Sequence, residues 1–166
     1  HPAGINTILA EPGLAKMTLY HHFKSKDDLI VAALERRGQE ICRARDEALA
    51  KAGSSPRRRL LALFESYAGW FASPDFNGCA FIRAVAEYPD GSTPVHQVVE
   101  REKKKLIATP EGLLGELQVR SAPAVARQIH LLIEGAIVSA HTFGDSTSAT
   151  QARDAALALV AAHTRA

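Results

Sequence analysis

Clusters of glycine, proline and small polar residues divide this sequence into segments whose apolar side chains recur at helical spacing. No segment alternates apolar and polar residues over several positions, which is the pattern of a half-buried strand. The sequence therefore predicts an all-α protein. The expected helices cover about residues 26–51, 56–72, 79–88, 94 onward, 122–143 and 149–163.

Residues typical of helix ends stand at several of these boundaries. Ser25 and Asp28 form a capping box at the start of the first expected helix. Ser121 is expected to cap the fifth helix and Gly144 to end it. Pro110 is expected to kink or split the fourth, because proline has no backbone N–H to donate.

The composition excludes several classes of protein. Two cysteines among 166 residues are too few for the disulfide framework of a small secreted protein. No apolar run reaches the roughly 18 residues of a transmembrane helix, and no leader peptide opens the chain. We therefore expect no membrane partner and a cytoplasmic location.

Sequence patterns of common catalytic sites are absent. The chain has no nucleophile elbow, no glycine-rich phosphate loop and no zinc-protease histidine pair. His130, Glu134 and His141 share one helical face, but the two histidines would lie about 16 Å apart at about 1.5 Å per residue, too far for one metal ion. We expect no enzyme, metal or cofactor; an all-α enzyme using histidine and glutamate is the weakest alternative.

Positive charge is concentrated toward the start of the chain. Residues 1–59 contain 11 lysines and arginines against 7 acidic residues, whereas residues 60–166 contain 9 against 11. A basic head on an acidic body indicates that the head meets an anion. A solvated surface with an uneven charge count is the alternative.

Two short helical segments near the start are separated by a turn at Pro12-Gly13, which is the helix-turn-helix pattern. In the second segment, Ala15, Leu19 and Phe23 share one face, which is expected to be buried. The remaining surface has no acidic side chain and suits a groove lined by phosphates. It comprises Met17, Thr18, Tyr20, His21 and Lys24. From geometry alone, an αα-hairpin with a polar face explains these residues equally well.

The run from Gly4 to Leu29 resembles the DNA-binding signature of the TetR family of transcriptional regulators. The most specific part is Thr18-Leu19-Tyr20-His21-His22-Phe23 followed by Ser25-Lys26-Asp27-Asp28-Leu29. In that family a three-helix head binds operator DNA, and a larger helical body binds a small effector and dimerises. By position, the resemblance implies DNA contacts from Lys16, Thr18, Tyr20, His21 and Lys26, to which the exposed face adds Met17 and Lys24.

Two features depart from the family pattern. Pro12 stands where a small residue is usual, and only four residues precede Ile5, where the family has a further helix. We expect that first helix to exist in the full protein. The predicted architecture is a partial helix-turn-helix head at residues 1–28 on a helical effector-binding and dimerisation body at residues 29–166.

The last two expected helices are rich in small residues, which allow helices to approach closely. With the resemblance, they predict a homodimer joined by a four-helix bundle across a two-fold axis, and packing within one chain is the alternative. The expected interface residues are Gly135, Ala136, Ser139, Ala140, Ala152, Ala155, Ala156 and Leu159.

An apolar cavity with a few polar groups is expected between the middle helices and the penultimate one. Its expected lining residues are Tyr67, Trp70, Phe71, Phe81, Ile82, His96, His130 and Glu134. The function predicted from the sequence is a one-component repressor that a small, largely apolar effector releases from a palindromic operator in double-stranded DNA. A helical small-molecule binding protein with a degenerate DNA-binding head is the alternative.

Overall fold

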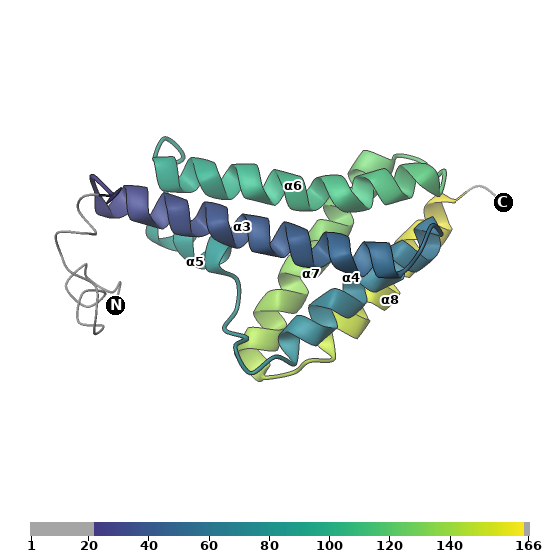
Figure 1. The fold of residues 1–166 in the computed structure, drawn as a ribbon. Helices are drawn as coiled ribbons and strands as arrows, with labels where there is room; N and C mark the ends of the chain where they lie inside the picture. Colours follow the sequence, from purple (N-terminus) through teal and green to yellow (C-terminus); the bar gives the residue numbers. More distant parts are fainter. Residues whose placement is uncertain (1–21, 165–166) are drawn as a thin grey trace.

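The computed structural model describes residues 22–164, and within this range the chain forms helices and no strands (Figure 1). The helices are α3 (Lys26–Lys51), α4 (Pro56–Phe71), α5 (Ala80–Glu87), α6 (Pro94–Glu116), α7 (Ala122–Phe143) and α8 (Ser148–His163). The all-α prediction is confirmed, and the predicted boundaries, which left the end of the helix from residue 94 open, agree with these to within a residue. None of the helices described is long and apolar enough to cross a membrane.

Local signals account for most helix ends. The Ser25 hydroxyl accepts a hydrogen bond from the Asp28 backbone N–H at 3.0 Å, as the capping box predicts. Gly144 ends α7 with φ at +67°, a left-handed conformation that glycine adopts without steric cost.

The prediction that Ser121 caps α7 is confirmed for its position at the N-cap but not for its side chain. Ser121 does precede the helix, but its hydroxyl makes no capping hydrogen bond, and its backbone is left-handed with φ at +55°. Its carbonyl oxygen instead accepts from the backbone N–H groups of Ala124 and Val125, at 2.8 and 3.1 Å. The main chain therefore closes the first turn without the side chain.

Pro110 is predicted to kink or split its helix, and the split does not occur, because α6 runs without a break from Pro94 to Glu116. Proline in a helix interior costs about 3 kcal/mol through its lost hydrogen bond and its steric clash. The Pro110 ring is fully buried in the core near Leu113 and Leu114. Apolar burial of the ring offsets part of that cost, so the helix continues.

The long helices α3 and α6 lie side by side, and α7 passes behind them to pack against α8 and α4 (Figure 1). One hydrophobic core joins all of these helices; its most deeply buried large side chains are Leu60, Phe64, Phe81, Leu113, Leu114 and Ile129. The predicted boundary between residues 28 and 29 falls inside α3, so that helix is shared by the expected head and body.

Four residues predicted at the dimer interface instead hold α7 and α8 together within one chain. They are Ala136, Ala140, Ala152 and Ala156, each at most 8% exposed. Small side chains let the two helices approach closely, so the burial of this set within one chain agrees with the alternative of intrachain packing.

Candidate functional site

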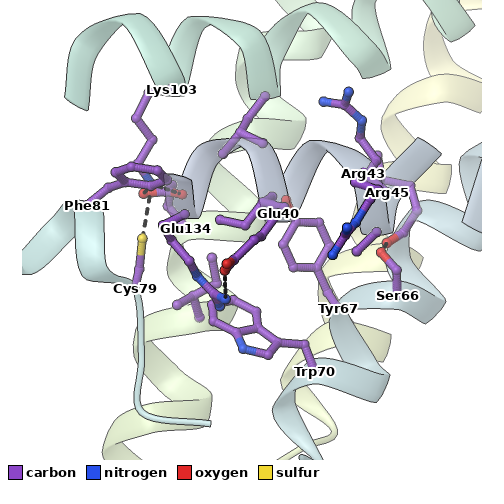
Figure 2. A pocket seen from close by; sticks show the side chains of 16 residues that line it. Glu40, Arg43, Arg45, Ser66, Tyr67, Trp70, Cys79, Phe81, Lys103 and Glu134 are labelled. Carbon is purple, nitrogen blue, oxygen red and sulfur yellow. Dashed lines mark hydrogen bonds and ion pairs between the residues drawn. The ribbon is translucent and has the colours of Figure 1, made fainter. Parts of the chain in front are cut away.

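A cavity of about 380 Å³, partly open to solvent, is lined by residues of α3, α4, α6 and α7 and by the start of α5 (Figure 2). We call it the central cavity. Its lining residues are Arg37, Glu40, Ile41, Arg43, Ala44, Arg45, Leu63, Ser66, Tyr67, Trp70, Cys79, Phe81, Lys103, Leu106, Glu134 and Ile137. The volume is in the range of pockets that hold small organic molecules, about 300–1,000 Å³.

One wall of the central cavity is aromatic. Tyr67 and Trp70 are three residues apart on α4 and therefore share a face, with ring centroids 6.4 Å apart. A third aromatic ring, Phe81 on α5, is only 1% exposed and lines the other end of the cavity, beside Lys103 (Figure 2). Trp70 is held in place from behind by Phe76, whose ring meets it edge-on at 5.0 Å. A flat apolar molecule can pack against this wall.

Tyr67 brings a polar group to this wall. Burial, and then the negative charge of Glu134, raise the pKa of Tyr67 far above its ordinary value, so its hydroxyl keeps its proton. That hydroxyl makes no hydrogen bond to any residue in the range 22–164. It is therefore free to donate a hydrogen bond to a ligand.

An ionic cluster closes one end of the central cavity. The Lys103 ammonium on α6 donates to both carboxylate oxygens of Glu134 on α7, at 2.7 and 2.6 Å. It also donates to the Cys79 sulfur at 3.5 Å and lies 5.8 Å from the centre of the Phe81 ring (Figure 2). Because all of these charges and dipoles are satisfied locally, the cluster mainly ties α5, α6 and α7 together.

His130 lies behind this cluster, with Nε2 4.0 Å from Glu134 Oε1. Burial lowers the pKa of His130; the carboxylate of Glu134 opposes this shift and the ammonium of Lys103 adds to it. Of the residues described, no three histidines, cysteines or carboxylates are grouped to hold a metal ion. His141 contacts the ring of Phe76 instead, at 6.2 Å between centroids.

Arginines of α3 line another side of the central cavity. Arg37 is placed over Trp70, 5.9 Å from the ring centre, and is paired with Glu40 at 3.5 Å. Arg45 donates to a single Asp46 oxygen through Nε and Nη2, at 2.9 and 2.8 Å. Its third nitrogen, Nη1, is buried and has no hydrogen-bond partner among the described residues.

Four of the eight residues predicted for the cavity line it, namely Tyr67, Trp70, Phe81 and Glu134. The other four lie elsewhere. Phe71 is buried behind Trp70, and Ile82 packs against the core. His130 lies behind Glu134, and the His96 ring is hydrogen-bonded to the Tyr88 carbonyl at 2.9 Å, beyond the opposite end of α5.

Sequence reasoning missed the α3 side of the cavity. Arg37, Ile41 and Arg45 recur every four residues and share one face of α3, which could have indicated a common environment. Because they belong to a strongly charged helix, the pattern is equally typical of a solvated surface. Lys103 was missed for the same reason, within the charged run of α6.

Most residues predicted to contact DNA lie outside the described range. They are Lys16, Met17, Thr18, Tyr20 and His21. Lys24 is exposed, and Lys26 is the first residue of α3. Next to Lys26, Asp27 accepts a hydrogen bond from the Tyr88 hydroxyl at 2.8 Å, which connects the end of α5 with the start of α3.

An apolar surface is exposed along α7. Leu131, Val138 and Phe143 are 70%, 49% and 78% exposed, the large hydrophobic residues that stand out on the surface of the described chain. Gly135, also exposed, lies on α7 between Leu131 and Val138. Of the remaining predicted interface residues, Ala155 is exposed and Ser139 and Leu159 are half-buried.

The helical fold and the cavity of residues 22–164 define a class of all-α body with room for a small molecule, and comparisons with known proteins identify the family. Residues 56–156 match the family described as "Tetracyclin repressor-like, C-terminal domain". Residues 1–33 match "Bacterial regulatory proteins, tetR family". The chain belongs to the TetR family of transcriptional regulators, which are DNA-binding regulators and not enzymes.

Individual relatives agree with this assignment. The chain is 27% identical over 119 residues to the HTH-type transcriptional regulator YjdC of Escherichia coli K12, a match that covers 72% of this chain and 62% of YjdC. It thus spans less than two thirds of that relative. The TetR-family regulator SCO4454 of Streptomyces coelicolor is 30% identical with a TM-score of 0.90, covering 99% of this chain and 87% of that one. Reduced E. coli NemR, at 21% identity and a TM-score of 0.82, covers 96% and 87% and shares the fold.

Proposed function

We propose that this TetR-family regulator is a homodimeric repressor, released from a palindromic operator when a small molecule binds in the central cavity. The observation that carries the proposal is the position of α3. It contributes six of the residues that line the cavity, and its first residues, from Lys26, belong to the predicted DNA-binding motif. A ligand in the cavity therefore touches the helix that leads to the head.

A second connection joins the cavity to the start of α3. Cys79 and Phe81 line the cavity at one end of α5, and Tyr88 follows its other end. The Tyr88 hydroxyl is hydrogen-bonded to Asp27 in the first turn of α3. A displacement of α5 by a ligand would therefore reach the residues beside Lys26, which we assign to phosphate contact.

The exposed apolar surface of α7 supports a dimer of two-fold symmetry. We propose that Leu131, Gly135 and Val138 meet their counterparts, together with exposed residues of α8 such as Ala155. Two heads then read two half-sites separated by whole turns of the duplex. We assign residues 1–28 to the head and 29–166 to the body, and place the protein in the cytoplasm, where that DNA is.

The regulation we propose is a shift between two arrangements of the dimer. A ligand shifts this balance only by binding one arrangement more tightly than the other. The arrangement with an occupied cavity is the one whose heads no longer match the spacing of the operator.

A gel-shift experiment with the full-length protein and the DNA upstream of its own gene tests the proposal. We expect a complex whose affinity falls steeply with salt, because Lys and Arg displace counterions from phosphates. Lys26→Ala should weaken binding to all DNA sequences, whereas Lys51→Ala, which removes the same charge at the far end of α3, should not. Failure of the full-length dimer to bind any duplex overturns the proposal and leaves the small-molecule binding protein.

A further inference from the structure

We propose that the central cavity takes an aromatic carboxylate, with its ring against Tyr67 and Trp70 and its carboxylate at Arg45. This inference rests on the proposed function in one respect, that the molecule bound there is the effector. It narrows the largely apolar effector predicted from the sequence to one that carries a negative charge.

The charges around the central cavity leave a positive excess. Four basic and two acidic residues line it, and Asp46, which lies outside the lining, forms an ion pair with Arg45 and offsets part of this excess. Both acidic residues are already neutralised: Glu134 by Lys103, and Glu40 by Arg36 and Arg37, at 3.1 and 3.5 Å. A ligand cation would therefore find no free carboxylate among the lining residues.

The unsatisfied groups of the cavity are hydrogen-bond donors. Arg45 uses two of its nitrogens on one Asp46 oxygen, and Nη1 is left buried without an acceptor among the described residues. Arg43, also a lining residue, is exposed to solvent and forms no ion pair within the range 22–164, so the buried unsatisfied donor belongs to Arg45. A buried donor without a partner is destabilising, so binding a ligand that supplies an acceptor is favoured over binding one that does not.

Tyr67 places a second donor beside Arg45. Figure 2 shows its ring between the Arg45 and Trp70 sides of the cavity, and the charge of Arg45 is close enough to act on the Tyr67 hydroxyl. A guanidinium and a protonated phenol match the two oxygens of a carboxylate, since a planar fork of N–H groups suits that acceptor best. We infer that the Arg45 guanidinium turns toward the bound carboxylate, giving Nη1 its acceptor.

The aromatic wall defines the rest of the ligand. Offset stacking or edge-to-face packing on Tyr67 and Trp70 favours a flat ring system over an aliphatic chain. At about 380 Å³ the cavity has room for two fused rings. An inorganic anion would satisfy Arg45 but would leave this wall without a contact.

The two probes that test the inference are 2-naphthoate and its neutral isostere 2-naphthamide. Binding to the full-length protein is measured by calorimetry, and the emission of Trp70, the single tryptophan of the chain, reports whether the probe occupies the cavity. We expect 2-naphthoate to bind at least tenfold more tightly than 2-naphthamide and to quench Trp70.

Two variants assign that preference to the cavity. Arg45→Gln should abolish the tenfold preference, and Tyr67→Phe should reduce it a few-fold while keeping the aromatic wall. Arg57→Gln, which removes an exposed arginine outside the cavity, should leave it unchanged. The comparison of the two probes on the wild-type protein stands even if Arg45→Gln does not fold.

Three results would overturn the inference. They are equal binding of the two probes, binding of neither, and a carboxylate preference that survives in Arg45→Gln. If the two probes bind equally and also release operator DNA, the proposed function stands. Only the inference that the effector carries a negative charge is then overturned. Loss of DNA binding in the gel-shift experiment would instead remove the proposed function, whatever the probes do.

Discussion

At the scale of single residues, several ionisable groups that are largely shielded from solvent lie in or beside the central cavity. Lys103 and Glu134 neutralise each other, Tyr67 and His130 are held neutral by burial, and Arg45 is left with an unused donor. A neutral buried histidine and an ion pair tolerate a low dielectric, whereas an unpaired donor does not. This contrast is the reason for assigning the ligand to the Arg45 side.

His130 makes stability depend on pH. Its pKa is lowered in the folded state, so below about pH 6.5 the unfolded chain binds a proton more readily than the folded chain. Stability is therefore fully present above that pH and falls as the pH decreases through it. We expect His130→Gln to lose less stability than the wild type between pH 7.5 and 5.5, measured by urea unfolding.

His141→Gln provides the control for this experiment, since it removes an exposed histidine from the same helix. If the wild type and His130→Gln lost the same stability over this pH range, the result would contradict the lowered pKa of His130 in the folded protein.

At the scale of helices, α3 and α6 approach closely at one glycine. Gly38 is buried on α3, facing Glu102 on α6, a carboxylate that is only 4% exposed. Lys105 holds Glu102 at 2.8 Å, and Arg101 lies 3.5 Å from it. The carboxylate therefore has little freedom to move away from α3, and the absence of a side chain at position 38 sets the distance between the two helices.

We expect Gly38→Ala to destabilise the protein by about 1–3 kcal/mol, because overpacking forces neighbouring groups to shift. A β-carbon at this position would lie 2.8 Å from Glu102 Cδ. Gly112→Ala, in open space on α6, should instead stabilise by up to about 1 kcal/mol through helix propensity. Urea unfolding of both variants measures the difference, and a neutral Gly38→Ala would show that α3 and α6 can separate freely.

The hydrogen bond between Tyr88 and Asp27 is the element-scale contact most relevant to regulation. Tyr88→Phe removes it and should change the free energy of unfolding by about 1 kcal/mol at most. We expect a larger effect on coupling: the ratio of operator affinities without and with effector should fall several-fold in a fluorescence-anisotropy titration.

Thr164→Val is a suitable comparison for Tyr88→Phe, because it also removes one side-chain hydrogen bond, at 2.8 Å, but at the end of α8. Were both variants to keep the wild-type ratio, transmission through α5 would be excluded and the direct contact of the ligand with α3 would carry the signal.

At the scale of the whole molecule, the two faces of α7 have separate roles. One face packs inside the body through Ile129, Ile133 and Ala136, whereas the other exposes Leu131 and Val138 to solvent. Large exposed apolar residues on a well-packed body are typical of an interaction surface. The cavity residue Glu134 and the exposed residues Leu131 and Val138 belong to this one helix. A ligand bound beside Glu134 would therefore lie close to the proposed dimer contact.

We expect Leu131→Glu to convert the dimer to a monomer without unfolding it, since Leu131 is 70% exposed in the single chain. Two glutamates would then face each other across the two-fold axis. Their repulsion should lower the dimer affinity by a factor between several-fold and orders of magnitude. Light scattering coupled to size exclusion measures the mass. Ala108→Glu, an exposed position on α6, should remain dimeric; an undiminished mass for Leu131→Glu would place the interface elsewhere.

The sequence by itself determined the all-α class, the family, and the ends of the helices in the described range, except for the end of α6, which it left open. These features depend on signals within a turn or two of helix, such as the Ser25 cap and Gly144, or on one contiguous motif. The tertiary structure alone decided that Pro110 stays inside a helix, and that Ala136 and Ala152 pack within the chain. It also decided that Arg45 and Lys103 face one cavity. Those outcomes depend on how helices far apart in the sequence cross, and a periodic pattern shows that a helix has a buried face but not which partner covers it.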